Sequence, residues 1–330
     1  MQKAESIKFG PPRAVTLDYG AAGTPVLLRN LSGAASIGEL LWTVSDEGRT
    51  VECLRRAKTG FVLEDQINLD GLFPDVPGAA DGDELDLEEC SISGGRLWLC
   101  GSHCRVRRKP ADGQHLNAEV MRRPSRQFFG SIPLTRAGAR SDGEVFLLPP
   151  SGRNSLRRVL RGNSNNLAPY LALPSKEGGL DIEGMLVRGA SAFLGLRGPL
   201  IDSFAVVVEL ALSDRLKKGV SIAHVHFLAL DGLGVRGLAR WGKDILLIAG
   251  PVADSKTPFR LHLWRPRRVD VIQSAETVLQ WTGAQEKPEA ICPLTDETGQ
   301  AGLLTLFDSP NSARVSGRRY KGEWRAISAR

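Results

Sequence analysis

Short apolar segments recur along the chain in pairs, and each pair is joined by a turn that contains glycine. Strict alternation of apolar and polar residues, seen in residues 224–228 and 260–264, is typical of strands with one face packed on a neighbour. The uninterrupted apolar runs AVVV and ILLI instead predict inner strands that are buried on both faces. The pairs are LSGAASI with GELLWTVSDE, DLEECSI with GRLWLCGSH, DIEGMLV with SAFLGLRGP, GVRGLAR with DILLIAGP, and KPEAICP with GLLTLFDSP.

The first segments of these pairs share one aligned position, and this position defines a repeat. The aligned residues are Gly33, Glu88, Glu183, Arg236 and Glu289, with successive spacings of 55, 95, 53 and 53 residues. A third and often a fourth strand candidate follows each pair, and four short antiparallel strands about every 50 residues are typical of a propeller blade. We therefore predict that residues 1–330 form a single all-β domain, a β-propeller of five four-stranded blades.

The one long spacing contains an insertion at residues 105–174, which holds the only helical pattern of the chain, around residues 151–173. Six blades are the alternative, if this insertion contains a degenerate blade. The N-terminal segment RAVTLDY, residues 13–19, is predicted to complete the last blade. Such a strand would close the ring and remove two exposed sheet edges.

Composition and charge narrow the class of protein further. The 36 glycines and 19 prolines favour many short elements and argue against a helical bundle. Residues 105–161 hold 13 Arg or Lys against 4 Asp or Glu, a local charge of +9 in a chain whose net charge is +6. The excess predicts either an anionic partner such as nucleic acid or an insertion kept in solution by arginine. Few aromatic residues are interleaved for base stacking, which disfavours nucleic acid.

The cysteine content and the apolar runs indicate a compartment. Five cysteines are an odd, sparse set that does not resemble a disulfide framework, so a reducing compartment is expected. The first residues lack the apolar run of a signal peptide, and the longest apolar stretches fall short of the roughly 18 residues of a membrane span. We expect a soluble cytoplasmic protein with no membrane partner.

The repeat position has a chemical consequence, because the innermost strands of a propeller line its central channel. Glu88, Glu183 and Glu289 would meet at one mouth of this channel, with Arg236 among them and Gly33 leaving a gap, while Asp86 and Asp181 precede two of the glutamates by two residues. Converging carboxylates can bind a hard cation such as calcium or magnesium, pair with arginines, or supply a general acid or base. The metal ligands predicted on this basis are Glu88, Glu183, Glu289, Asp86 and Asp181.

A second ring is expected where the second strands end, in the segments GSHCR, GLRGP, AGP and FDSP. Polar residues among glycines suit turns that direct side chains at a surface or pocket. His103, Arg197 and Asp308 are the chemically capable residues of these segments. The predicted ligand-binding set is therefore Glu88, Glu183, Arg236, Glu289, Arg197, His103 and Asp308.

The blocks GSHCR, GGLDIEGM, FLGLRGP, VHFLALDGLGVRGLA, ILLIAGP, PFRLHLW, EKPEAI and LLTLFDSP resemble a bacterial family defined only as a domain of unknown function, over about residues 30–315. More distantly, DIEGM and KPEAI are similar to the Glu-Gly motifs of phytase-like and esterase-like β-propellers. The resemblance implies a propeller fold in which Glu183 and Glu289 face the central channel. The repeats departing from the Glu pattern are the fourth, with Arg236, and the first, with Gly33.

Three functions are compatible with these observations. The first is a ligand-binding or protein-interaction module that acts through the channel mouth. The second is a metal-assisted hydrolase of phosphate or carboxylic esters, in which the same carboxylates hold the metal. The third is a binder of an anionic partner that acts through the basic insertion. The chain contains no familiar catalytic signature, so the sequence does not decide whether the protein is an enzyme.

Overall fold

A computed structural model describes residues 7–162, 167–213, 219–253, 255, 257–281, 286–308 and 310–329. Strands dominate this part of the chain, and the helices are α1 (Pro25–Arg29), α2 (Leu156–Arg161) and four 3-10 turns at Gly20–Ala22, Pro124–Arg126, Ala168–Ala172 and Ser175–Glu177. The helix α2 and the turn Ala168–Ala172 lie within the stretch for which helical structure is predicted. None of the described helices is long and apolar enough to cross a membrane.

Four sheets are built from strands in sequence order, each pairing antiparallel with the next. The first sheet is β3 (Leu31–Ile37), β4 (Leu40–Ser45), β5 (Thr50–Ala57) and β6 (Gly60–Asn68), and the second is β7 (Leu87–Ser93), β8 (Arg96–Gly101), β11 (Phe129–Pro133) and β12 (Phe146–Leu147). The third is β13 (Asp181–Arg188), β14 (Ser191–Gly198), β15 (Ala205–Leu212) and β16 (Val220–Ala229), with β20 (Gln273–Ser274) parallel to β16. The fourth is β17 (Gly234–Trp241), β18 (Asp244–Gly250), β19 (Phe259–Trp264) and β21 (Glu276–Trp281).

The first and second strands of these four sheets are joined by two-residue turns. Gly38, Gly94, Gly189 and Gly242 occupy the first position of these turns, with φ between +57° and +61°. Tight hairpin turns need positive φ there, and glycine adopts it without steric cost. The Gly-containing turns read from the sequence therefore fix where each hairpin reverses.

The last sheet is completed by the N-terminal part of the chain. Its strands are β22 (Lys287–Thr295), β23 (Ala301–Asp308), β25 (Arg319–Ala329) and β2 (Arg13–Asp18), and the short strands β1 (Ile7–Phe9) and β24 (Val315–Ser316) also pair with β25. The predicted closure by residues 13–19 is thus confirmed. β2 also pairs in parallel with β6 of the first sheet, so the sheet edge is covered.

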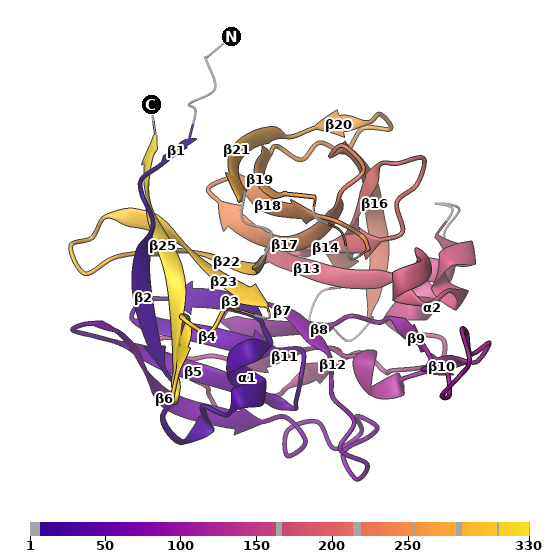
Figure 1. The fold of residues 1–330 in the computed structure, drawn as a ribbon, viewed down its shortest axis with the longest axis horizontal. Helices are drawn as coiled ribbons and strands as arrows, with labels where there is room; N and C mark the ends of the chain where they lie inside the picture. The colour runs from indigo at the N-terminus through magenta and orange to yellow at the C-terminus, as the bar shows by residue number, and fades with distance from the viewer. Residues whose placement is uncertain are drawn as a thin grey trace.

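The five first strands form the centre of the molecule (Figure 1). β3, β7, β13, β17 and β22 each contact the first strands of the two adjacent sheets, and β22 contacts β3. A cycle of sheets around a common axis is a β-propeller, so the predicted fold class is confirmed. In the described part of residues 105–174, β11 and β12 belong to the second sheet and β9 (Arg105–Arg107) pairs only with β10 (Val120–Arg122), so this segment adds no further four-stranded sheet.

Five hydrophobic clusters fill the spaces between adjacent sheets. Trp42 of β4 belongs to the cluster between the first and second sheets, and Trp264 of β19 belongs to that between the third and fourth. The cluster that holds Leu41 and Tyr320 joins the first sheet to the last and closes the circle. Because every sheet packs on two neighbours, its middle strands are buried on both faces, which explains the AVVV and ILLI runs.

Candidate functional site

The register of every inner strand breaks near its start. In β7, Leu87 pairs with Gly101 and Glu89 pairs with Cys100, which leaves Glu88 without a partner between them. The same break isolates one residue in each of the other inner strands. A β-bulge of this kind turns its extra side chain out of the regular alternation. The bulged residues are Ser32, Glu88, Glu183, Arg236 and Glu289.

The bulges correct the alignment of the first repeat by one residue. Ser32, and not Gly33, is equivalent to Glu88, and the Ser32 hydroxyl donates to the carbonyl oxygen of Leu87 in the adjacent inner strand. Gly33 has a packing role instead, because a Cβ built there would lie 2.7 Å from the Cα of Glu89. The predicted gap at Gly33 is therefore a close approach between two inner strands, and a hydroxyl occupies the first bulge.

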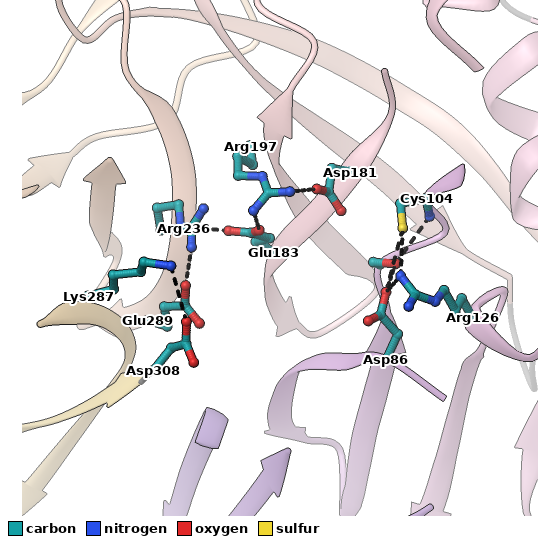
Figure 2. A network of polar contacts seen from close by, with 11 residues as sticks. Asp86, Cys104, Arg126, Asp181, Glu183, Arg197, Arg236, Lys287, Glu289 and Asp308 are labelled. Atoms are coloured by element: carbon teal, nitrogen blue, oxygen red, sulfur yellow. Dashed lines mark hydrogen bonds and ion pairs between the residues drawn. The ribbon is translucent and has the colours of Figure 1, made fainter. Parts of the chain in front are cut away.

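Two arginines, the partly buried Arg197 and the buried Arg236, connect carboxylates of the third and last sheets (Figure 2). Arg197 of β14 pairs with Asp181 and, at 2.7 Å between Nη1 and Oε1, with Glu183. Arg236 pairs through Nε with the other oxygen of Glu183, also at 2.7 Å, and through Nη2 with Glu289. The structure thus brings together these predicted site residues from β13, β14, β17 and β22. Such a network holds the inner strands in one arrangement, and its charges depend on one another for compensation.

Glu88 has a different environment. Its carboxylate, that of Asp181 and that of Glu183 each offer an oxygen within 4.8 Å of the others, which makes them a group that could hold a metal ion. No arginine or lysine of the described residues forms an ion pair with Glu88. Burial, and then the negative charges of Asp86 and Glu183, raise the pKa of Glu88 well above its usual range. This carboxylate therefore needs a proton or a cation.

Asp86 is held at the edge of this group by a separate set of contacts (Figure 2). Asp86 directly precedes β7, and its φ of +53° is uncommon for a residue other than glycine. The Ser102 hydroxyl donates to Asp86, and Arg126 pairs with it at 3.0 Å between Nη1 and Oδ2. Cys104 Sγ lies 3.6 Å from the same oxygen. Of the predicted metal ligands, Glu88, Asp181 and Glu183 lie together, and Asp181 and Glu183 also pair with Arg197, whereas Asp86 and Glu289 lie outside this group.

The second ring brings Asp308 and one unpredicted carboxylate to the same mouth. Asp308 ends β23, and its carboxylate lies 3.6 Å from Lys287 Nζ. Asp46 follows β4 at the equivalent place in the first sheet. Burial, followed by the charges of Glu289 and Asp308, raises the pKa of Asp46 to about 9. Burial likewise raises the pKa of Glu289 to about 7, against the opposing effect of Arg236. The sequence signal for Asp46 was the segment VSDE, which ends its strand pair as FDSP does.

His103 does not join this group. Its ring nitrogen Nε2 lies 3.1 Å from the carbonyl oxygen of Phe128, and burial and the charge of Arg157 lower its pKa to about 3. The imidazole is therefore neutral and fixed within the protein. Ser102, one residue earlier, is the equivalent of Asp308 in the second sheet. Its backbone amide donates to the carbonyl oxygen of Asp86, just before β7, and Asp308 likewise lies opposite Lys287 at the start of β22.

A second glutamate, Glu89, lies beneath the bulges and was not predicted. Its side chain is 1% exposed, and one of its oxygens accepts a hydrogen bond from the amide of Cys90 at 3.0 Å. Burial raises its pKa well above the usual range, against the lowering effect of amides from Leu238 and Ala34. These amides belong to β17 and β3, so Glu89 reaches two other inner strands and occupies the channel below the mouth.

Comparisons with solved structures find distant likenesses. Glutaminyl cyclase from Myxococcus xanthus is 7% identical over 99% of this chain and 98% of that chain, with a TM-score of 0.47. An exo-β-1,3-galactanase from Clostridium thermocellum is 11% identical over 95% of this chain and 62% of that chain, also with a TM-score of 0.47. The allergen Mala s 1 from Malassezia sympodialis is 11% identical over 89% and 77%, with a TM-score of 0.42. At these identities and scores, the three proteins inform neither the activity nor the ligand of this chain.

The sequence comparisons identify a family. A search of curated proteins finds no match. A family model described as "Protein of unknown function (DUF3616)" matches residues 30–320, which include all five inner strands. The resemblance noted from the sequence blocks is thereby confirmed, and the chain belongs to the DUF3616 family.

Proposed function

We propose that the protein is a binding module whose channel mouth takes a cationic ligand, and that a divalent cation such as calcium or magnesium is its simplest form. The observation that carries this proposal is Glu88, a carboxylate placed beside Asp181 and Glu183 without an ion pair of its own in the described chain. Oxygen ligands from carboxylates are those that hard divalent cations prefer.

The charge balance of the mouth supports a cation over an anion. Among the described residues, seven carboxylates and four cationic side chains lie there, an excess of three carboxylates. In a buried setting such an excess must take up protons or bind a cation. The carboxylates are Asp46, Asp86, Glu88, Asp181, Glu183, Glu289 and Asp308, and the cations are Arg126, Arg197, Arg236 and Lys287.

Calorimetric titration with CaCl₂ and separately with MgCl₂ tests the proposal. We expect one site, with an affinity that rises from pH 6 to pH 8, because the cation displaces protons from carboxylates whose pKa is raised. Glu88→Gln should abolish binding, whereas Glu297→Gln, at an exposed carboxylate between β22 and β23, should leave it unchanged. Equal binding by the two variants, or no binding by the native protein at either pH, would contradict the proposal.

A metal-assisted hydrolase is the second candidate, and Glu289 is the observation that favours it. A carboxyl group with a pKa of about 7 can accept and return a proton near neutral pH. Under this proposal the cation would hold a phosphate or carboxylic ester, and Glu289→Gln would remove turnover while leaving cation binding intact. Hydrolysis of 4-nitrophenyl phosphate and 4-nitrophenyl acetate in the presence of the cation measures this, and the absence of turnover leaves the binding module as the function.

The cytoplasmic location stays a proposal of the same kind. All five cysteines are buried free thiols, which supports a reducing compartment.

A further inference from the structure

A cavity of about 690 Å³ lies in the basic insertion, away from the centre of the propeller. Its walls come from β9, β10, the segment 122–127 and the segment 150–161 that contains α2, which Figure 1 shows together at one side of the molecule. Cys104 forms part of the wall closest to the mouth. Six arginines line the cavity: Arg105, Arg122, Arg123, Arg157, Arg158 and Arg161.

Most of the positive charges of this cavity have no ion-pair partner among the described residues. Arg123 pairs with Asp83 at 3.0 Å, but Arg105, Arg122, Arg158 and Arg161 form no ion pair with any described residue. The residues lining the cavity include no aspartate or glutamate. Elsewhere in the insertion Arg107, Arg108 and Arg126 form ion pairs, whereas Arg136, Arg140 and Arg153 form none with a described residue. Four arginines without an ion pair in the described chain thus line one hollow.

One of these arginines is held in place by the backbone. Arg157 donates to the carbonyl oxygens of His103 and Leu171, which fix the direction of its guanidinium. Burial and the charge of Arg105 lower the pKa of Arg157 to about 10. The guanidinium groups gathered around the cavity repel one another, and a bound anion offsets the free-energy cost of this repulsion. A guanidinium already fixed by the protein loses little freedom when the anion binds.

The size and the lining of the cavity indicate a small ligand. A volume of this order is typical of small-molecule sites, which span roughly 300–1,000 Å³. No aromatic side chain lines the cavity, so it lacks the stacking surfaces that single-stranded nucleic acids use. Arginine presents a planar fork of donors that matches phosphate oxygens. Four unpaired arginines balance about two phosphate groups, each carrying a charge of roughly −1.5 to −2.

We propose that this cavity binds a small ligand that carries two or more phosphate groups. The proposal is independent of the cation site at the channel mouth, because it rests on other residues and the opposite charge.

Calorimetric titration with sodium tripolyphosphate, with inorganic phosphate and citrate as comparison anions, tests it. At 150 mM NaCl we expect tripolyphosphate to bind at one site and at least tenfold more tightly than either comparison anion. Arg122→Gln and Arg161→Gln, both at exposed side chains that the fold does not need, should each weaken binding about tenfold. Arg136→Gln, an exposed arginine outside the cavity, is the matched control and should bind as the native protein does.

Three results would overturn the proposal. The first is no binding of tripolyphosphate, and the second is an equal loss in Arg122→Gln and Arg136→Gln, which would indicate attraction to net charge alone. The third is tighter binding of a 20-nucleotide oligo(dT) than of tripolyphosphate, weakened by the same cavity variants, since the ligand would then be nucleic acid. Glu88→Gln should leave tripolyphosphate binding unchanged, so failure at the mouth and failure at the cavity can be told apart.

Discussion

Arg236 is the residue on which the arrangement of the channel mouth depends most, because it joins carboxylates of two other inner strands. Its side chain is 6% exposed and pairs with both Glu183 and Glu289. Arg236→Met keeps most of the side-chain length and removes the charge. Two buried carboxylates then lose a cation, and breaking a buried pair in this way costs about 3–5 kcal/mol of unfolding free energy.

The loss of unfolding free energy in Arg236→Met should depend on pH, and the direction of this dependence follows from the pKa of Glu289. Its folded-state pKa, about 7, lies above its unfolded value, so the stability it contributes is complete below pH 4 and is lost as the pH rises through 7. Without Arg236 the folded-state pKa rises further, and the loss continues to higher pH. Each additional proton held by the folded variant enlarges its deficit by about 1.4 kcal/mol per pH unit. The deficit is therefore larger at pH 8 than at pH 6.

Urea unfolding followed by tryptophan fluorescence at pH 6 and pH 8 measures both effects. Arg240→Met, an exposed arginine of the same strand, serves as the control and should lose less than about 0.5 kcal/mol. Adding Glu289→Gln to Arg236→Met should restore part of the stability at pH 8, because one uncompensated charge is removed. A deficit below 1 kcal/mol that is equal at the two pH values would refute the reasoning.

Two further predictions concern the inner strands. Glu89→Gln should flatten the fall in stability between pH 6 and pH 9, because burial raises the folded-state pKa of Glu89 and its deprotonation destabilises the native protein. A pH series of thermal unfolding detects the change. An unaltered slope of stability against pH would count against it. Gly33→Ala should lower the free energy of unfolding by about 1–3 kcal/mol, because the new Cβ meets the backbone of the adjacent inner strand. Gly71→Ala, which has room for a Cβ, serves as the control in a urea titration. Equal stability of the two variants would show that the strands can separate.

The fold could be predicted from the sequence because each sheet of the propeller corresponds to one copy of a sequence repeat. The paired apolar segments mark the two strands nearest the axis in each sheet, and the glycine turns mark where they reverse. The later strands of the second sheet, β11 and β12, lie within residues 105–174, the segment predicted as an insertion. Apolar periodicity indicates that a strand exists, but it does not show how much chain lies between two paired strands.

The residues of the mouth were predicted less completely than the fold, for two physical reasons. A β-bulge adds one residue to a strand, so an alignment of strands without coordinates can slip by one, as it did at Gly33 and Ser32. His103 was selected because it is the chemically capable residue of GSHCR, whereas Ser102 is the residue that pairs with Asp86. Glu89 was missed because the other repeats have a small residue at its position, and only coordinates show that its side chain reaches across the channel.

The central claim is that carboxylates from separate inner strands together hold a cation. A crystallographic measurement tests this claim most directly. Crystals grown at pH 8 with MnCl₂, which takes oxygen ligands as magnesium and calcium do, should give an anomalous difference peak roughly 2.0–2.5 Å from oxygens of Glu88, Asp181 and Glu183. The peak should vanish in Glu88→Gln crystals. An empty map in the native protein, with Glu88 directed away from the other two carboxylates, would contradict the account.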